Sequence, residues 1–224
     1  KDLGERGWRV GVVSRGYKGR ISTPTLISSE SDASETGDEA LLIAQQADVP
    51  VVVCPDRAKA VQRLEAESVN MILSDDGLQH WAMGRTVEVS VVDGQYGYGN
   101  GLLLPAGPLR EPRSRLKSVD IQVRRGGESA AHEFSIDSKV RGVRNLKSNE
   151  LRELSSFESR AVIAVAGIHR PERFFKMLRE NNIEIRELAF PDHHQYSVGD
   201  IPASGIVLMT AKDAVKCRSF AKAD

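Results

Sequence analysis

The sequence predicts an α/β fold, with a mostly parallel sheet in a larger first domain and a second, smaller α/β domain after it. Two observations favour this fold class. Short apolar runs alternate with helical patterns along the chain, which is typical of parallel strands covered by helices on both faces. A more polar stretch, residues 126–157, separates two such series. We therefore expect a core over residues 1–127, a linker with a β-ribbon over 128–157, and a second domain over 158–224.

The composition is that of a globular protein and gives no sign of a nucleic-acid or membrane partner. The 224 residues are 40% hydrophobic and 28% charged, which is enough to bury a normal core. Lys plus Arg equals Asp plus Glu at 31 each, so net charge favours neither nucleic acid nor an acidic membrane surface as a partner. The two cysteines, Cys54 and Cys217, follow no metal-binding spacing, and a reducing cytoplasm is expected. No run of 18 apolar residues occurs, so no membrane-spanning helix is expected.

The first series of elements begins after Lys1–Arg6, which we expect to be the tail of a preceding helix. Apolar runs predict strands at 9–14, 50–54, 70–74, 87–92 and 120–123. Residues 21–36, rich in Ser, Thr and Glu, indicate a surface loop. A helix is expected from Gly37 to Ala47 and another over 56–67, the second with Ala58, Val61 and Leu64 on its inner face. Glycines and prolines over 97–108 indicate an ordered loop.

The second series begins with an apolar strand at 161–167. A helix over 171–182 follows, then a strand at 184–190, the loop Pro191–His194, and a strand at 206–209. Before it, a short alternating stretch at 134–140 is the part of the linker that we expect to form the β-ribbon.

The stretch Asn70–His80 is central to the predicted site. Three apolar residues lead into Asp75 and Asp76, and Gly77 then breaks the run. In open α/β sheets, ligands bind outside the carboxyl ends of the strands. Two carboxylates at such an end are suited to a magnesium ion bound to a nucleotide. The alternative is an acidic turn in which Asp76 caps the next helix.

Other residue types suited to phosphoryl transfer are spread along the chain. Asp38 and Glu39 could supply a base, although carboxylates in a first helical turn are also explained by the helix dipole. His193 or His194 could handle a proton. Four basic side chains could bind phosphate or lie in solvated turns: Arg15, Lys18, Arg110 and Arg113. Together these residues suggest a nucleotide-dependent transfer built on positioning and charge neutralisation.

Several blocks in order resemble the tetraacyldisaccharide 4′-kinase family, the lipid A kinases. The most specific are Asp75-Asp76-Gly77-Leu78-Gln79-His80 and Leu104-Pro105-Ala106-Gly107-Pro108-Leu109-Arg110-Glu111. The resemblance extends over nearly the whole chain through further blocks: Ser14–Tyr17, Gly37–Glu39, Gly99–Gly101, Arg115–Asp120, Ala166–Ile168, Arg173–Phe175, Asp192-His193, Met209-Thr210 and Lys212–Lys216.

The resemblance implies a P-loop-NTPase-like fold and an ATP- and Mg²⁺-dependent transfer to the 4′-hydroxyl of a lipid A disaccharide precursor. It also implies a peripheral position at the cytoplasmic face of the bacterial inner membrane. By the same resemblance, Asp38 is the base, His193 orients it, and Arg110 neutralises charge on the transferred group. Asp75, Asp76 and Glu39 are implied to hold magnesium. The implied substrate- or phosphate-binding residues are Arg15, Tyr17, Gln79, His80 and Asn100.

The chain also departs from the family pattern. The family's Walker A loop, which ends in Gly-Lys-Thr, and its membrane-anchoring segment should lie before Lys1, and these residues contain neither. We therefore expect a fragment that is inactive alone. Local departures occur at Lys18, Ala40, Arg125, His169, Arg170 and Ala211. Two rival hypotheses stay open, a non-catalytic lipid- or nucleotide-binding relative and a metal-dependent sugar-nucleotide hydrolase.

Overall fold

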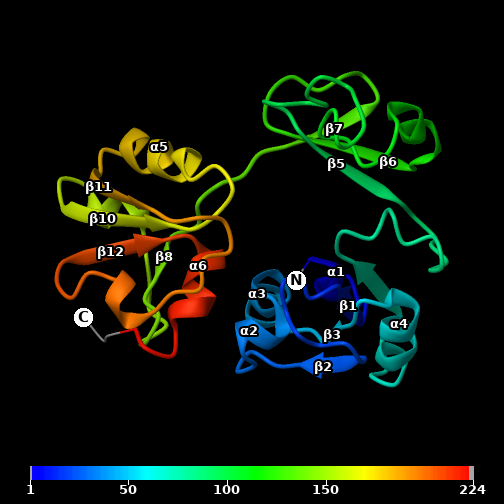
Figure 1. The fold of residues 1–224 in the computed structure, drawn as a ribbon, viewed down its shortest axis with the longest axis horizontal. Helices are drawn as coiled ribbons and strands as arrows, with labels where there is room; N and C mark the ends of the chain where they lie inside the picture. Colours follow the sequence, from blue (N-terminus) through cyan, green and yellow to red (C-terminus); the bar gives the residue numbers. More distant parts are fainter. Residues whose placement is uncertain (1, 222–224) are drawn as a thin grey trace. The chain divides into compact units, whose positions relative to one another are not determined.

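A computed structural model describes residues 2–221 of the chain, and Figure 1 shows the elements in sequence colours. The chain divides into two compact units. The first unit spans the described residues up to Gly77 and from Arg141 onward, and the second unit spans Leu78–Val140. The domain boundaries predicted from composition, at residues 127 and 158, stay a prediction.

The first unit contains a four-stranded sheet in the order β2-β3-β1-β4. Its strands are β1 (Val10–Ser14), β2 (Thr25–Ile27), β3 (Val51–Val53) and β4 (Met71–Ser74). β3 and β4 run parallel to β1 on its two sides, and β2 is an antiparallel edge strand. The helices of this part are α1 (Asp2–Glu5), α2 (Ala33–Thr36), α3 (Asp38–Ala47) and α4 (Arg57–Glu65). The surface loop predicted over 21–36 was therefore wrong in part, because β2 and α2 lie within it.

Helices cover both faces of this sheet. Val51 and Val53 of β3 pack with Ala40 of α3 on one face. On the other face Leu64 of α4 lies so close to Gly11 that a side chain there would meet Leu64 Cδ2 at 2.6 Å. The predicted inner face of α4 is confirmed for Leu64, which is fully buried. The other buried residues of α4 are Arg57 and Ala60, whereas the sequence predicted Ala58 and Val61, each one position later.

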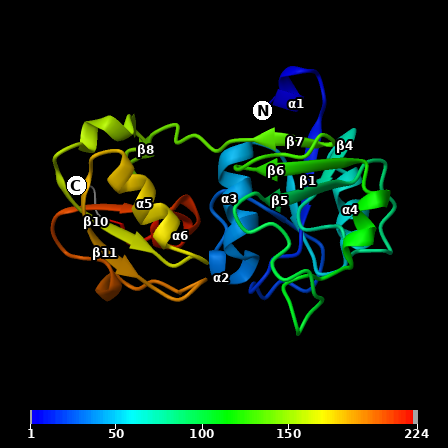
Figure 2. The ribbon, with the colours of Figure 1, turned by 90° about the horizontal axis from the view of Figure 1, so that it is seen from above.

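A second parallel sheet of the first unit has the order β11-β10-β12. It consists of β10 (Ala161–Ala166), β11 (Glu184–Ala189) and β12 (Ile206–Met209). α5 (Glu172–Glu180) packs Phe175 and Leu178 on one face of β10, and α6 (Ala211–Cys217) places Cys217 against Val165 on the other. Short 3₁₀ helices are η2 (Leu154–Phe157) and η3 (Val198–Asp200). α6 lies beside α3 in both views (Figures 1 and 2).

The second unit is built on a parallel sheet in the order β5-β6-β7. Its strands are β5 (Val89–Asp93), β6 (Ile121–Arg125) and β7 (Glu133–Ile136), and η1 (Arg113–Ser118) precedes β6. The stretch expected to form a ribbon instead adds β7 in parallel to β6. In the first unit, β8 (Val143–Arg144) and β9 (Leu151–Arg152) form an antiparallel ribbon. Parallel strands with helices on both faces confirm the predicted α/β class.

Candidate active site

Asp38 and His193 meet in the first unit although 155 residues separate them in the sequence. Asp38 is the first residue of α3, and His193 lies in the loop after β11. His193 Nδ1 lies 3.1 Å from Asp38 Oδ2. The His193 backbone N–H donates to the Gly167 carbonyl at 3.1 Å, which ties this loop to the end of β10. The two side chains are only 8% and 1% exposed, so the pair is shielded from water.

His194, the alternative proton-handling residue, lies in different surroundings. Its ring stacks on Phe190 with the centroids 4.5 Å apart, and it meets the Tyr196 ring edge-on. His194 Nε2 lies 3.5 Å from Asp200 Oδ2. The geometry therefore places His193, rather than its neighbour, on Asp38, and the role of the pair in catalysis stays a prediction.

Lys212 of α6 determines which nitrogen of His193 carries the proton. Lys212 Nζ lies 3.2 Å from His193 Nε2 and 3.0 Å from Glu39 Oε1. Because an ammonium group only donates hydrogen bonds, Nε2 must accept one. This partner assigns the ring proton to Nδ1, so that Nδ1–H donates to the Asp38 carboxylate. The rings of Tyr17 and His193 meet edge to face, with the centroids 5.3 Å apart.

A second lysine of α6, Lys216, lies behind Asp38. Lys216 Nζ is 3.4 Å from Asp38 Oδ2 and 3.1 Å from Asp213 Oδ1. Asp213 is itself held in place, since its Oδ2 accepts hydrogen bonds from the Gly167 N–H at 3.1 Å and from Thr210 Oγ1 at 2.7 Å. All three charged side chains are at most 2% exposed. Buried charges are tolerated only when they are paired in this way.

Asp75 and Asp76 follow the carboxyl end of β4, as the sequence predicts for a ligand-binding edge. Asp75 Oδ2 lies 3.5 Å from Ser14 Oγ at the end of β1. The buried Arg57 donates to the Asp75 carbonyl and so fixes the backbone at this edge. Burial raises the pKa of Asp75, and the nearby carboxylates of Glu39 and Asp76 raise it further, while Arg57 opposes them.

This edge fits a magnesium ion carried by a nucleotide. In residues 2–221 no three His, Cys, Asp or Glu side chains gather closely enough to hold a metal by themselves. Magnesium usually takes one or two carboxylates and completes its shell with phosphate and water oxygens. Burial is the first cause of the raised pKa of Asp75, and the neighbouring carboxylates are the second; a divalent cation at this edge would oppose both, because it favours the charged carboxylate. The Glu39 carboxylate, also predicted as a ligand, is bonded to Lys212.

The loop after β1 contains the predicted phosphate-binding residues Arg15 and Tyr17, and both are exposed. Lys18 occupies the left-handed region with φ 62°, where a glycine is favoured. Lys18 therefore adopts a backbone conformation that a glycine would adopt without strain. Lys18 Nζ lies 3.5 Å from the Asp192 carbonyl, next to His193.

The remaining predicted residues belong to the second unit. Gln79 Nε2 donates to Glu111 at 2.7 Å, and Arg110 Nη1 lies 3.4 Å from Gln79 Oε1. Asn100 bonds to its own loop, donating to the Ala106 carbonyl at 2.9 Å and accepting from the Leu102 N–H at 3.1 Å. These bonds give Asn100 a structural task in the glycine- and proline-rich loop. His80 lies in the turn between Gly77 and Met83. The predicted binding roles of these residues stay predictions.

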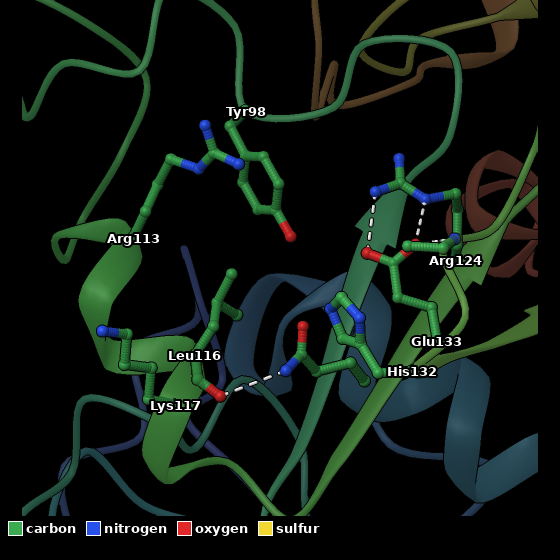
Figure 3. Close-up of a pocket in the computed structure, with 9 residues that line it drawn as sticks. Tyr98, Arg113, Leu116, Lys117, Arg124, His132 and Glu133 are labelled. Carbon is green, nitrogen blue, oxygen red and sulfur yellow. Dashed lines mark hydrogen bonds and ion pairs between the residues drawn. The ribbon is translucent and has the colours of Figure 1, made fainter.

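The second unit also contains an open cavity of about 380 Å³ (Figure 3). Of the predicted phosphate-binding residues, Arg113 lines it, stacked over the Tyr98 ring at 4.5 Å. Arg124 and Glu133 form a two-pronged ion pair in its wall, with N–O distances of 2.5 and 2.8 Å. This pairing, with a backbone hydrogen bond from Ala130, lowers the pKa of Glu133 to about 2. None of the residues predicted for the transfer step lines the cavity.

Sequence reasoning assigned no role to Lys212, Lys216 or Arg57. A signal for the two lysines was present. Thr210-x-x-Asp213 has the spacing of a capping box, and the Thr210 hydroxyl does accept from the Asp213 N–H. A helix starting there places residues four apart on one face, so Lys212 and Lys216 point the same way. No comparable signal marks Arg57, because arginine is seldom fully buried.

An α/β fold with carboxylates at the strand ends and a buried Asp–His pair defines the class of a phosphoryl-transfer enzyme that works by positioning. The family model described as tetraacyldisaccharide-1-P 4′-kinase matches residues 1–224. The chain belongs to this kinase family.

Relatives agree with this assignment. A tetraacyldisaccharide 4′-kinase of Thiobacillus denitrificans is 47% identical over 99% of this chain and 70% of that protein. One of Nitrosococcus oceani is 45% identical over 98% of this chain and 66% of that protein. The fold also matches the solved structure of the "apo" form of LpxK from Aquifex aeolicus in complex with ATP. That match has a TM-score of 0.82 and 28% identity, and covers 98% of this chain and 73% of that one.

Proposed function

We propose that this protein transfers the γ-phosphoryl group of ATP to the 4′-hydroxyl of a tetraacyldisaccharide 1-phosphate, a precursor of lipid A. The observation that carries the proposal is the bond from His193 Nδ1 to the buried Asp38 carboxylate. It occurs in a chain whose relatives are 4′-kinases. A carboxylate held by a histidine is suited to accept a hydroxyl proton during transfer.

In the proposed reaction Asp38 takes the proton of the 4′-hydroxyl while the hydroxyl oxygen bonds to the γ-phosphorus. The bond from that phosphorus to the bridging oxygen breaks, and ADP leaves with the electron pair. His193 holds Asp38 through Nδ1–H, and Lys212 keeps the histidine in that tautomer. Because Asp38 is 1% exposed, the side chains that cover it must shift before a sugar hydroxyl can reach it.

Asp75 and Asp76 would hold the magnesium ion that accompanies ATP. The ion, when bound, neutralises charge on the phosphates. The proposed task of Arg110 is to neutralise charge on the transferred group, as guanidinium groups do in other phosphoryl transfers. Arg15, Tyr17, Gln79, His80 and Asn100 are proposed to complete the substrate or phosphate surroundings.

The acylated substrate implies work at a membrane surface. No helix in the described part of the chain is long and apolar enough to cross a bilayer. Because of the acylated substrate, we propose peripheral contact with the cytoplasmic face of the inner membrane, where the acyl chains of the substrate stay in the lipid layer.

The test follows labelled phosphate from ATP to the disaccharide, with the complete gene product and mixed micelles of the lipid. We expect a 4′-phosphorylated product, and in Asp38→Ala a turnover lower by about 10²–10⁴ with the KM for ATP little changed. Asp48→Ala is the matched control, since Asp48 is an exposed carboxylate just beyond the other end of α3.

Other outcomes favour the rival functions. Release of free phosphate without labelled lipid would favour a hydrolase that uses Asp75 and Asp76. Lipid binding without any phosphate transfer would favour a non-catalytic relative. Unchanged turnover in Asp38→Ala would contradict the assignment of the base.

A further inference from the structure

Lys216 is an unusual side chain because its charge lies inside the protein. Its side chain is 2% exposed, and its Nζ lies between two carboxylates, Asp38 and Asp213. The Tyr196 ring covers it, with Nζ 5.0 Å from the ring centroid. A lysine is almost never buried unless the ammonium group is paired. The contacts of Lys216 with Asp38 and with Asp213 therefore both need an explanation.

Two side chains make their closest approach to the same oxygen of Asp38. The closest approaches of His193 Nδ1, at 3.1 Å, and of Lys216 Nζ, at 3.4 Å, both run to Oδ2. The hydrogen bond with His193 Nδ1 and the ion pair with Lys216 both act on Oδ2, and together they favour one rotation of the carboxylate about its last side-chain bond. This leaves Oδ1 for a hydroxyl group once the side chains that cover Asp38 have shifted.

Asp213 acts as the anchor of this arrangement. Its Oδ2 is held by the Gly167 N–H at the end of β10 and by Thr210 Oγ1 at the start of α6. Its Oδ1 faces Lys216 at 3.1 Å. Asp213 is thus held at the end of β10 and at the start of α6, and it holds the ammonium group of Lys216. Through this ammonium group, Asp38 is linked to the same two elements.

We propose that Lys216, anchored by Asp213, is a positioning residue for the transfer reaction: it holds Asp38 through Oδ2 so that Oδ1 receives the substrate proton. This inference rests on the proposed function for the identity of the reaction. Its structural part, the hold of Lys216 on the Asp38–His193 pair, is measurable without any substrate.

The competing explanation is that Lys216 only neutralises the buried Asp213. Three variants of the complete gene product separate the two explanations: Lys216→Met, Asp213→Asn, and both together. Removing Lys216 alone leaves two buried carboxylates without their cation, and we expect a lower melting temperature. The double variant removes both opposite charges at nearly constant shape, so the melting temperature should recover.

Turnover should behave differently from stability. If Lys216 positions Asp38, kcat stays at least about tenfold below that of the unsubstituted protein in the double variant, with the KM for ATP unchanged. Asp213→Asn alone keeps the ammonium group but weakens its anchor, so we expect a turnover between that of the unsubstituted protein and that of Lys216→Met. Lys176→Met, on the exposed face of α5, is the control and should change neither quantity. Recovery of both melting temperature and kcat in the double variant would overturn the proposal.

A spectroscopic readout separates this proposal from the proposed function. The Nδ1–H proton of His193, identified by its loss in His193→Gln, reports the bond to Asp38 in the protein without substrate. We expect this signal to move in Lys216→Met and in the double variant, and to stay in place in Lys176→Met. A moved signal in a protein that phosphorylates no lipid would support the hold on Asp38 and refute the proposed function. An unmoved signal would overturn the inference whatever the activity.

Discussion

Arg57 offers a test of how the edge beside Asp75 is built. Its side chain is 2% exposed, although arginine is normally a surface residue. Nη1 donates to the Cys54 carbonyl and Nη2 to the Asp75 carbonyl, each at 3.0 Å. One guanidinium group therefore joins the chain just after β3 to the chain just after β4. We predict that Arg57→Met weakens this edge and lowers stability.

The size of the effect follows from the two bonds. A hydrogen bond from a charged donor contributes about 1.5–3 kcal/mol, and the substitution also leaves two carbonyls without this donor. Since methionine recovers some apolar packing, we expect a loss of about 3–4 kcal/mol. For a chain of this length the melting temperature should fall by about 6–16 °C.

Urea and thermal unfolding followed by circular dichroism measure this loss. Arg63→Met on the same helix is the matched control, because Arg63 makes an i,i+4 pair with Glu67 at 2.7 Å in which both side chains are about one third exposed. Such a pair contributes about 0.3–0.5 kcal/mol. If the two variants differ by less than about 1 kcal/mol, the buried guanidinium does not hold the edge together as we argue.

Three further predictions concern the site and its surroundings. The raised pKa of Asp75 means that the folded protein binds a proton at this carboxyl more tightly than the unfolded chain does. Ionisation of Asp75 therefore lowers the stability of the folded protein as pH rises above 3.8, the ordinary pKa of an aspartate. Asp75→Asn should therefore melt higher than the unsubstituted protein at pH 7 in a chelator and equally below about pH 3.8; a lower melting point at pH 7 would contradict this. Burial raises the pKa of Cys217 to about 12, so its thiol should resist a disulfide reagent at pH 8 until the protein unfolds; rapid labelling of the native protein would refute its burial. Gly37→Ala, with φ 83° and a methyl group 2.7 Å from the Tyr17 carbonyl, should shift the start of α3 and lower both stability and turnover. Gly84→Ala, where the space is open, should be neutral in the same assays.

The strands could be predicted from the sequence because their signal is local. The run Val10–Ser14 and the run Ala161–Ala166 are apolar on both faces, as strands between two helix layers must be. β2 was missed because three residues at a sheet edge, Thr25–Ile27, are too few to show a period. The short helix α6 was not predicted as an element, since only its capping residues signal it.

The site depends on contacts between distant parts of the chain, which no local pattern reports. Asp75 at a strand end could be predicted from the apolar run before it. The meeting of Asp38 with His193 followed only from the family resemblance, because 155 residues lie between them. The position of Lys216 on the same carboxylate oxygen depends on how α6 packs beside α3. The burial of the Lys216 charge depends on tertiary packing, so the sequence of a short helix does not predict it.

A double-mutant cycle in kcat tests the central claim that Asp38 and His193 act as one unit. Asp38→Ala, His193→Ala and the double variant are compared in the complete gene product with labelled ATP and the lipid substrate, and His194→Ala is the control. We predict that the double variant is little slower than the slower single variant and that His194→Ala retains its turnover. Losses that multiply in the double variant, or a large loss in His194→Ala alone, would contradict it.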